Sequence, residues 1–178
     1  DGIRDCTRSL VGSEMCIRDR PERVRKLIVA DIAPVGYGHT QMSLIEAMRR
    51  LDLNAIKTRG EADLLIQNDV PDPRVRAFLL RSLDLANRRW RLNLDVLAAE
   101  MDKIIGFPDI EAEFNGSALF LSGADSDYVR PEHRERIRRL FPNAVFAKLP
   151  GAGHWLHAEK PREFEAAVDA FLTHVPAC

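Results

Sequence analysis

The fold is decided by residues 118–161, which read ALFLSGADSDYVRPEHRERIRRLFPNAVFAKLPGAGHWLHAEKP. A short apolar run in this stretch, 118–121, is typical of a buried strand, and the segment 145–149 predicts a further strand. Each of the two is followed by a helical segment, and Pro131 and Pro161 are well placed as first residues of those helices. Strands that alternate with helices predict an α/β fold with a parallel sheet covered by helices.

A third strand is expected before this stretch, because Leu27–Ala30 is a continuous apolar run that ends at Asp31. Residues 41–106 carry apolar residues at three- and four-residue steps, which predicts helices and no strand. This helical segment is longer than a crossover between strands needs, so we expect a cap over the end of the sheet. The predicted segments are a core strand in 21–38, a helical cap in 39–110 and the rest of the core in 111–178.

The first twenty residues, DGIRDCTRSLVGSEMCIRDR, do not fit this pattern. They show no helical or strand periodicity, and they lack the apolar region of a secretory signal. We interpret them as a non-native or disordered leader, of the kind left by sequencing-adapter read-through. In that case the native protein begins well upstream; the alternative is a genuine N-terminal tail.

Bulk composition describes a globular protein without a strong electrostatic field. The chain has 178 residues, 46% hydrophobic and 30% charged, with a formal net charge of -1. We therefore expect no attraction to nucleic acid or to an acidic membrane. No apolar run reaches the roughly 20 residues that span a bilayer. The cysteines Cys6, Cys16 and Cys178 predict neither a disulfide framework nor a zinc site.

Three polar groups follow the three predicted strands: Asp31, Asp125 and His154. In parallel α/β sheets, ligands bind beyond the carboxyl ends of the strands. A histidine beside a buried carboxylate is the base and orienting acid of a nucleophilic triad. The small residues before His154, in Gly151-Ala152-Gly153, allow the tight turn that brings the imidazole to the edge of the sheet.

Each candidate also has an ordinary structural explanation. Asp125 is equally typical of a turn aspartate that bonds nearby backbone, and Asp127 of a solvated loop residue. Asp31 is harder to explain structurally, because a charge directly after an apolar strand is costly without a partner. We expect the other four histidines to be structural or exposed: His39, His133, His157 and His174.

Four segments together resemble the α/β-hydrolase superfamily, in particular the YbfF-type esterases and similar mitochondrial abhydrolase-domain proteins. These segments are VADIAPV (29–35), WRLNL (90–94), ALFLSG (118–123) and GAGHW (151–155) followed by HAEKP (157–161). The resemblance covers residues 21–172. It implies the C-terminal part of the fold, with strands six to eight of the usual eight and an inserted helical cap.

The resemblance also implies roles for the polar groups. The superfamily orders its triad as serine, acid and histidine, so His154 would be the general base. The acid usually follows strand seven, here Asp125, but in the YbfF-like branch it follows strand six, here Asp31. We favour Asp31 slightly, and both remain candidates.

The nucleophile elbow Gly-x-Ser-x-Gly is absent from the chain. We therefore expect this portion to be inactive by itself, and its first core strand to expose an unpaired edge that favours aggregation. The implied activity of the intact enzyme is hydrolysis of short- to medium-chain acyl esters, or of acyl thioesters, without metal or organic cofactor.

Apolar residues of the cap and of the histidine loop are candidates for an acyl pocket, chiefly Phe78, Trp90 and Trp155, although ordinary packing explains them equally well. Two alternatives remain: a haloalkane dehalogenase-like hydrolase with an aspartate nucleophile, and a non-catalytic α/β interaction module. We expect a small-molecule partner and a cytoplasmic location. The oligomeric state cannot be read from the sequence.

Overall fold

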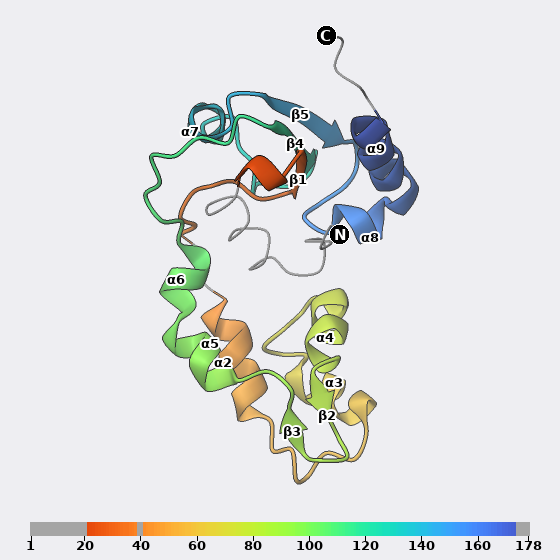
Figure 1. Cartoon of the computed structure of the whole chain (residues 1–178). Coiled ribbons are helices and arrows are strands. Elements are labelled where there is room, and N and C mark those ends of the chain that lie inside the picture. The colour runs from red at the N-terminus through yellow and green to blue at the C-terminus, as the bar shows by residue number, and fades with distance from the viewer. Residues whose placement is uncertain (1–20, 39–40, 174–178) are drawn as a thin grey trace, which may run out of the picture. The chain divides into compact units, whose positions relative to one another are not determined.

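The structure is a computed structural model that describes residues 21–38 and 41–173. The leader, His39, His174 and all three cysteines therefore lie outside the described residues. The chain forms two compact units (Figure 1). The described residues of the first, which we call the sheet unit, are 21–35 and 108–173. The second, which we call the helical unit, is Gly36–Phe107 apart from residues 39 and 40.

The sheet unit contains a parallel sheet of three strands in the order β1-β4-β5. These strands are β1 (Lys26–Ala30), β4 (Ser117–Gly123) and β5 (Ala144–Leu149). β4 lies in the centre and is buried from its second residue to its last. Its apolar run suits this place, because a central parallel strand is covered on both faces. The predicted parallel α/β architecture is therefore confirmed.

Helices cover both faces of this sheet, with α7 (His133–Leu140) on one side and α9 (Pro161–Thr173) on the other (Figure 1). Alternate residues of β4 supply the two cores. Phe120 packs in the cluster with Ile137 of α7. Leu119 and Leu121 pack with α9 and with α8 (Leu156–Glu159). A short 3-10 helix, η2 (Pro21–Arg23), precedes β1.

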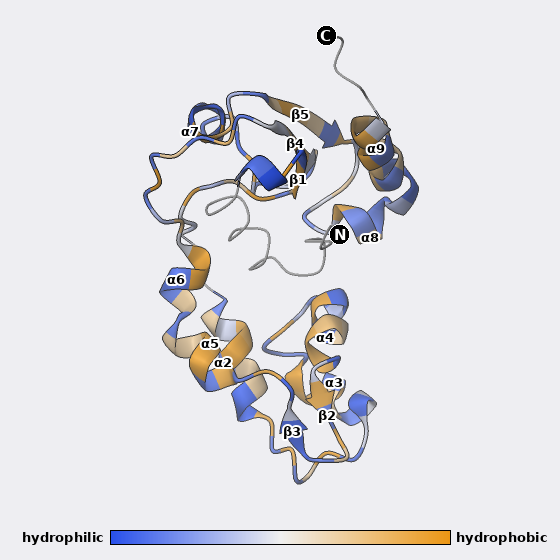
Figure 2. Cartoon of the chain, viewed as in Figure 1, coloured by the Kyte–Doolittle hydropathy of each residue, from blue (hydrophilic) through white to orange (hydrophobic). Residues whose placement is uncertain are grey.

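One predicted helix start is wrong. α7 begins at His133, and Pro131 lies in the turn before it. Of the eight residues of α7, only Ile137 and Leu140 are buried, and the helix is correspondingly hydrophilic in Figure 2. The stability of such an amphipathic helix comes mainly from the packing of its buried residues. The position of Pro131 therefore does not decide where α7 begins.

The helical unit consists of short helices and one small hairpin. The helices are α2 (Met42–Arg50), α3 (Arg59–Ile66), α4 (Pro73–Leu80), α5 (Leu94–Ala99) and α6 (Met101–Ile105). Side chains cap three of them: Thr58 accepts from the Glu61 N–H, Asp72 from Arg74 and Asn93 from Val96. Such caps satisfy backbone donors that have no partner inside the helix.

The hairpin corrects the expectation that this region has no strand. β2 (Leu83–Asp84) pairs antiparallel with β3 (Arg89–Trp90). The Asp84 carboxylate accepts hydrogen bonds from the backbone and side chain of Asn87, and Arg88 adopts a positive φ of 52°. Strands of two residues are too short to produce the period-two alternation by which strands are recognised.

The two ends of the helical unit meet. The Tyr37 N–H donates to the Ile105 carbonyl at 2.9 Å, and a side chain at Gly36 would lie 4.0 Å from the Gly106 Cα. The unit therefore leaves and rejoins the sheet unit through neighbouring residues. No helix in the described part of the chain is long and apolar enough to cross a membrane.

Candidate active site

Asp31 is the first residue after β1, and its side chain is completely buried. Its N–H donates to the Leu121 carbonyl at 2.8 Å, which extends the β1–β4 pairing by one residue. Its φ of 51° is in the left-handed region, which aspartate tolerates better than most residues. This change of backbone direction ends the strand and leaves the carboxylate beside the end of β4.

Three donors surround the Asp31 carboxylate. Oδ1 accepts from the Gly123 N–H at 3.1 Å, at the end of β4. Oδ2 accepts from the Ser126 hydroxyl at 2.5 Å and lies 2.8 Å from Nδ1 of His154. Hydrogen bonds to a buried carboxylate offset the cost of removing it from water. The charge that the sequence left unexplained therefore has partners from the loops that follow β4 and β5.

His154 lies on the loop between β5 and α8, and this loop packs directly on β4. A Cβ at Gly123 would be 2.3 Å from the carbonyl oxygens of both Ala152 and Gly153. Only glycine permits so close an approach. Gly151, with φ of 63°, makes the turn, and Glu159 accepts the Gly153 N–H at 2.7 Å. These contacts fix the backbone that carries the imidazole.

The bond to Asp31 determines what the imidazole can do. A carboxylate accepts, so Nδ1 of a neutral imidazole must be the protonated nitrogen, and Nε2 then has a free lone pair. The His154 side chain is 40% exposed, whereas Asp31 is fully buried. Within the described residues no hydrogen bond engages Nε2. The arrangement can therefore take up a proton at Nε2 while a buried charge stabilises the imidazolium.

Two further residues of this site were missed by the sequence interpretation. Ser126 bonds the acid, and the Tyr128 ring stacks on the imidazole with centroids 3.8 Å apart and planes 15° from parallel. Burial raises the pKa of Tyr128, and the charges of Asp127 and Asp31 raise it further. Neither residue belongs to a periodic pattern, so the only available signal was their place in the loop after β4.

The side-chain carboxylate of Asp125 makes no hydrogen bond to His154. Asp125 is exposed, and its backbone N–H donates to the Ala152 carbonyl at 3.0 Å. Asp127 is also exposed and pairs with Arg130 at 3.4 Å. Of the three acids near the strand ends, Asp31 is the one hydrogen-bonded to the imidazole.

The predicted acyl-contact residues lie in different surroundings. Trp155 is half-buried directly after His154. Trp90 packs against both core clusters of the helical unit, and its indole N–H donates to the Met48 carbonyl at 3.2 Å. Phe78 is 57% exposed on α4. Trp90 thus has a packing role within its own unit, while Phe78 offers apolar surface.

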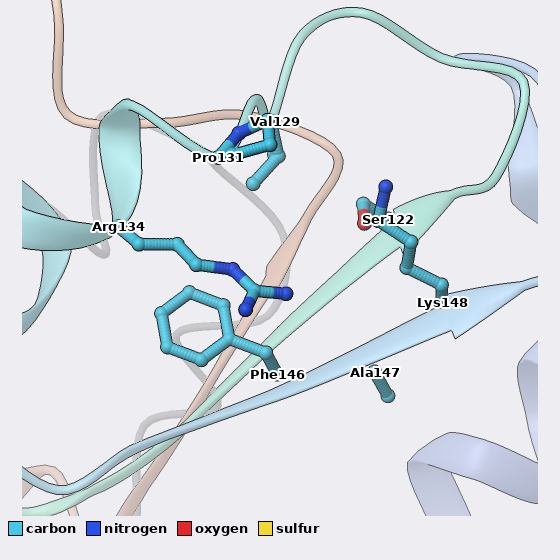
Figure 3. Close-up of a pocket in the computed structure, with 7 residues that line it drawn as sticks. All are labelled: Ser122, Val129, Pro131, Arg134, Phe146, Ala147 and Lys148. Atoms are coloured by element: carbon cyan, nitrogen blue, oxygen red, sulfur yellow. The ribbon is translucent and has the colours of Figure 1, made fainter.

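A cavity of about 50 Å³ lies against β4, β5 and the segment that leads into α7 (Figure 3). The Arg134 guanidinium lies over the Phe146 ring there, 5.1 Å from its centroid. Neither Asp31 nor His154 is among the lining residues. In the described ranges, 21–38 and 41–173, no group of three acidic, histidine or cysteine residues is arranged to hold a metal ion.

The sequence and the fold of this chain are similar to those of known proteins. A family model described as alpha/beta hydrolase family matches residues 9–167. The sn-1-specific diacylglycerol lipase ABHD11 of Mus musculus is 42% identical over 161 residues, covering 86% of this chain and 52% of the mouse protein. Esterase YbfF of Escherichia coli is 33% identical over 153 residues, covering 85% of this chain and 59% of that protein.

A solved structure, the marine microorganism esterase, superposes with a TM-score of 0.81 at 33% identity. The match covers 87% of this chain and 63% of the esterase. The chain thus spans about half the length of the curated relatives that it matches.

Proposed function

Because this chain belongs to the alpha/beta hydrolase family, we propose that it supplies the general base, His154, and the orienting acid, Asp31, of a serine esterase. The observation that carries the proposal is the 2.8 Å contact between His154 Nδ1 and a fully buried Asp31 carboxylate. In this superfamily the nucleophilic serine precedes the acid and the histidine. We place it in the part of the relatives that this chain does not span.

The proposed reaction is acyl transfer from an ester to water. Nε2 of His154 takes the serine proton as the serine oxygen attacks the ester carbonyl, and the imidazolium returns that proton to the departing alcohol. The acyl-enzyme is then hydrolysed, with His154 taking a proton from water and returning it to the serine. Asp31 remains ionised throughout and stabilises the imidazolium.

Asp31 is the better candidate for the acid than Asp125. The Asp31 carboxylate is aligned by the Gly123 N–H and the Ser126 hydroxyl, so its orientation is set before any substrate binds. Such preorganisation reduces the reorganisation needed when charge develops on the histidine. Asp125 is exposed and contributes its backbone N–H to the loop.

The names of two relatives support a proposal for the substrate class. The E. coli relative is named an esterase and the mouse relative a diacylglycerol lipase. We propose an acyl ester of short to medium chain length, with acyl thioesters as a variant. Trp155 offers apolar surface for the acyl chain directly beside His154. We propose that the helical unit serves as a cap, in which Phe78 supplies exposed apolar surface and Trp90 supports the core.

A chimera tests the proposal. The part of the marine microorganism esterase that precedes the matched region is joined to residues 21–178 of this chain. We expect the chimera to hydrolyse p-nitrophenyl butyrate and to react with a fluorophosphonate probe. His154→Ala should remove hydrolysis, whereas His157→Ala, at an exposed histidine three residues away, should retain it.

Two results would count against the proposal. One is a folded chimera that retains hydrolysis after His154→Ala. The other is native coding sequence upstream of Pro21 that encodes Gly-x-Asp-x-Gly at the nucleophile elbow, because an aspartate nucleophile belongs to dehalogenase-type chemistry rather than to serine esterases.

A further inference from the structure

Tyr128 is the residue of this site that the proposed reaction leaves without a role. Its ring is nearly parallel to the His154 imidazole, 15° apart with centroids at 3.8 Å. The hydrogen bond between Nδ1 and Asp31 fixes one nitrogen of the imidazole, but it does not by itself fix the plane of the ring, which can still tilt about the side-chain torsions. A flat ring in contact with one face of the imidazole restricts this tilting.

The backbone of Tyr128 is itself held by the same network. Its N–H donates to Oγ of Ser126 at 3.3 Å, and Ser126 in turn donates to Asp31. On the other side, the Tyr128 carbonyl lies 3.1 Å from Nδ1 of His133, the first residue of α7. Asp31 therefore holds the imidazole in two ways. It bonds Nδ1 directly, and through Ser126 it helps to hold the tyrosine that covers one face of the ring.

The chemistry of the phenol suits contact with a cation. Burial raises the pKa of Tyr128, with the charges of Asp127 and Asp31 adding to the effect, so the ring remains a neutral phenol at neutral pH. The face of a neutral aromatic ring attracts a cation within about 6 Å of its centroid. The imidazolium formed during the proposed reaction would lie well inside that distance.

Building on the proposed function, we propose that Tyr128 is a positioning residue that holds the His154 ring in its productive plane and stabilises the imidazolium relative to the neutral imidazole. The hydroxyl is not required for this role, and the aromatic face is. The proposal therefore predicts different results for Tyr128→Phe, which keeps the aromatic face, and for Tyr128→Leu, which removes this face while retaining apolar volume.

The first test is the titration of His154 in the full chain, followed by NMR of the imidazole. A contact worth about 0.5–1 kcal/mol corresponds to roughly half a pH unit. We expect the titration midpoint of Tyr128→Leu to fall by about that amount, that of Tyr128→Phe to stay within about 0.2, and that of Tyr128→Trp to rise, since indole binds cations best. The variants leave unchanged the other titratable groups on the segments that carry the two rings and their partners: Asp31, Asp125, Asp127, His133 and Glu159.

The second test uses the chimera. Tyr128→Leu should lower kcat about three-fold or more with little change in KM, and should move the acidic limb of the kcat/KM profile downward by about half a pH unit. Tyr128→Phe, which keeps the aromatic face, should leave both kcat and the acidic limb as in the unmodified chimera. Tyr37→Leu, the same change at the other tyrosine of the sequence, lies in the helical unit and should leave the acidic limb in place.

The outcomes distinguish this inference from the proposed function. If Tyr128→Leu folds, by circular dichroism, and titrates as the unmodified chain does, the stacking role is wrong whether or not the chimera is active. If Tyr128→Leu does not fold, the test becomes a comparison of Tyr128→Phe with Tyr128→Trp. Equal titration midpoints of His154 in these two variants would overturn the inference. An inert chimera with the expected titration shifts would reject the esterase proposal and leave the role of Tyr128 intact.

Discussion

The sheet unit and the helical unit are stabilised in different ways. In the sheet unit, the ends of β1, β4 and β5 converge on one buried carboxylate, Asp31, which bonds groups from two separate loops. In the helical unit, α3, α4 and α5 each have a side-chain cap of their own, and the buried residues form two small clusters. The difference teaches that a change at one residue of the sheet unit should disturb the whole site, whereas a change in the helical unit should remain local.

The largest effect should follow from removing the charge on which the sheet unit converges. Asp31→Asn in the chimera should lower kcat by about 10⁴, because the amide cannot stabilise the imidazolium and favours the wrong tautomer. Asp125→Asn is the matched control and should lower kcat less than about ten-fold, because the carboxylate of Asp125 is not bonded to His154. Initial rates with p-nitrophenyl butyrate measure both. Equal losses for the two variants would remove the distinction between these acids.

Replacing one glycine by alanine in each unit compares how closely the backbone is packed at the two positions. Gly123→Ala would place a Cβ 2.3 Å from two carbonyl oxygens, so we expect it to reduce the free energy of unfolding by about 3 kcal/mol through overpacking. Gly60 lies in α3, where the nearest atom to an added Cβ is 3.9 Å away. Gly60→Ala should therefore stabilise the protein by about 0.5–1 kcal/mol. Urea denaturation of the chimera gives both values, and a tolerated alanine at position 123 would contradict the close packing of the histidine loop.

Loss of a single helix cap should have a smaller and local effect. Thr58→Ala removes the hydroxyl that accepts the Glu61 N–H at 3.1 Å, which should cost about 1 kcal/mol. Amide hydrogen exchange should accelerate mainly within α3, while the exchange of β4 amides remains as before. Thr58→Ser keeps the acceptor and serves as the control. Faster exchange throughout the sheet unit would show that the two units are more closely coupled than their separate clusters suggest.

The smallest expected effect is a local change in the β2–β3 hairpin at acidic pH. Hydrogen bonds from Asn87, together with Arg89, hold the pKa of Asp84 below its ordinary value. A lowered folded-state pKa means that this contribution is fully present above roughly pH 4 and is lost as the pH falls through the lower folded value. Backbone chemical shifts of Asn87 should therefore change below about pH 4. Asp84→Asn should abolish that transition, and a persisting transition would assign it to another group.

The sequence was most informative where a physical signal is continuous. The unbroken apolar runs at 27–30 and 118–121 predicted β1 and β4, because strands covered on both faces need continuous apolar character. The mostly apolar segment 145–149, which Lys148 interrupts, predicted the edge strand β5. The structure places Asp31 and His154, two of the three polar groups predicted at the strand ends, in hydrogen-bonding contact. The sequence alone could not show which of Asp31 and Asp125 contacts the imidazole, since this depends on the positive φ of Asp31 and on which loop approaches β4.

Features that depend on one contact between distant residues gave no sequence signal. The stacking of Tyr128 on His154 joins two loops, and neither loop has a period that predicts it. Gly123 was read as part of a family motif, and its requirement for close approach appears only when the carbonyls of Ala152 and Gly153 are placed beside it. The two-residue strands of the hairpin were missed for the opposite reason, since their pattern is too short to be distinguished from a turn.

The hydrogen bond between Tyr37 and Ile105, which joins the two ends of the helical unit, bears on how such a protein can change over evolutionary time. An insert whose entry and exit are adjacent behaves like a cassette. Another insert with the same spacing between its ends can replace it without altering the register of β1 on β4. The helical unit can therefore be exchanged as a whole while the contact between Asp31 and His154 at the end of the sheet is kept.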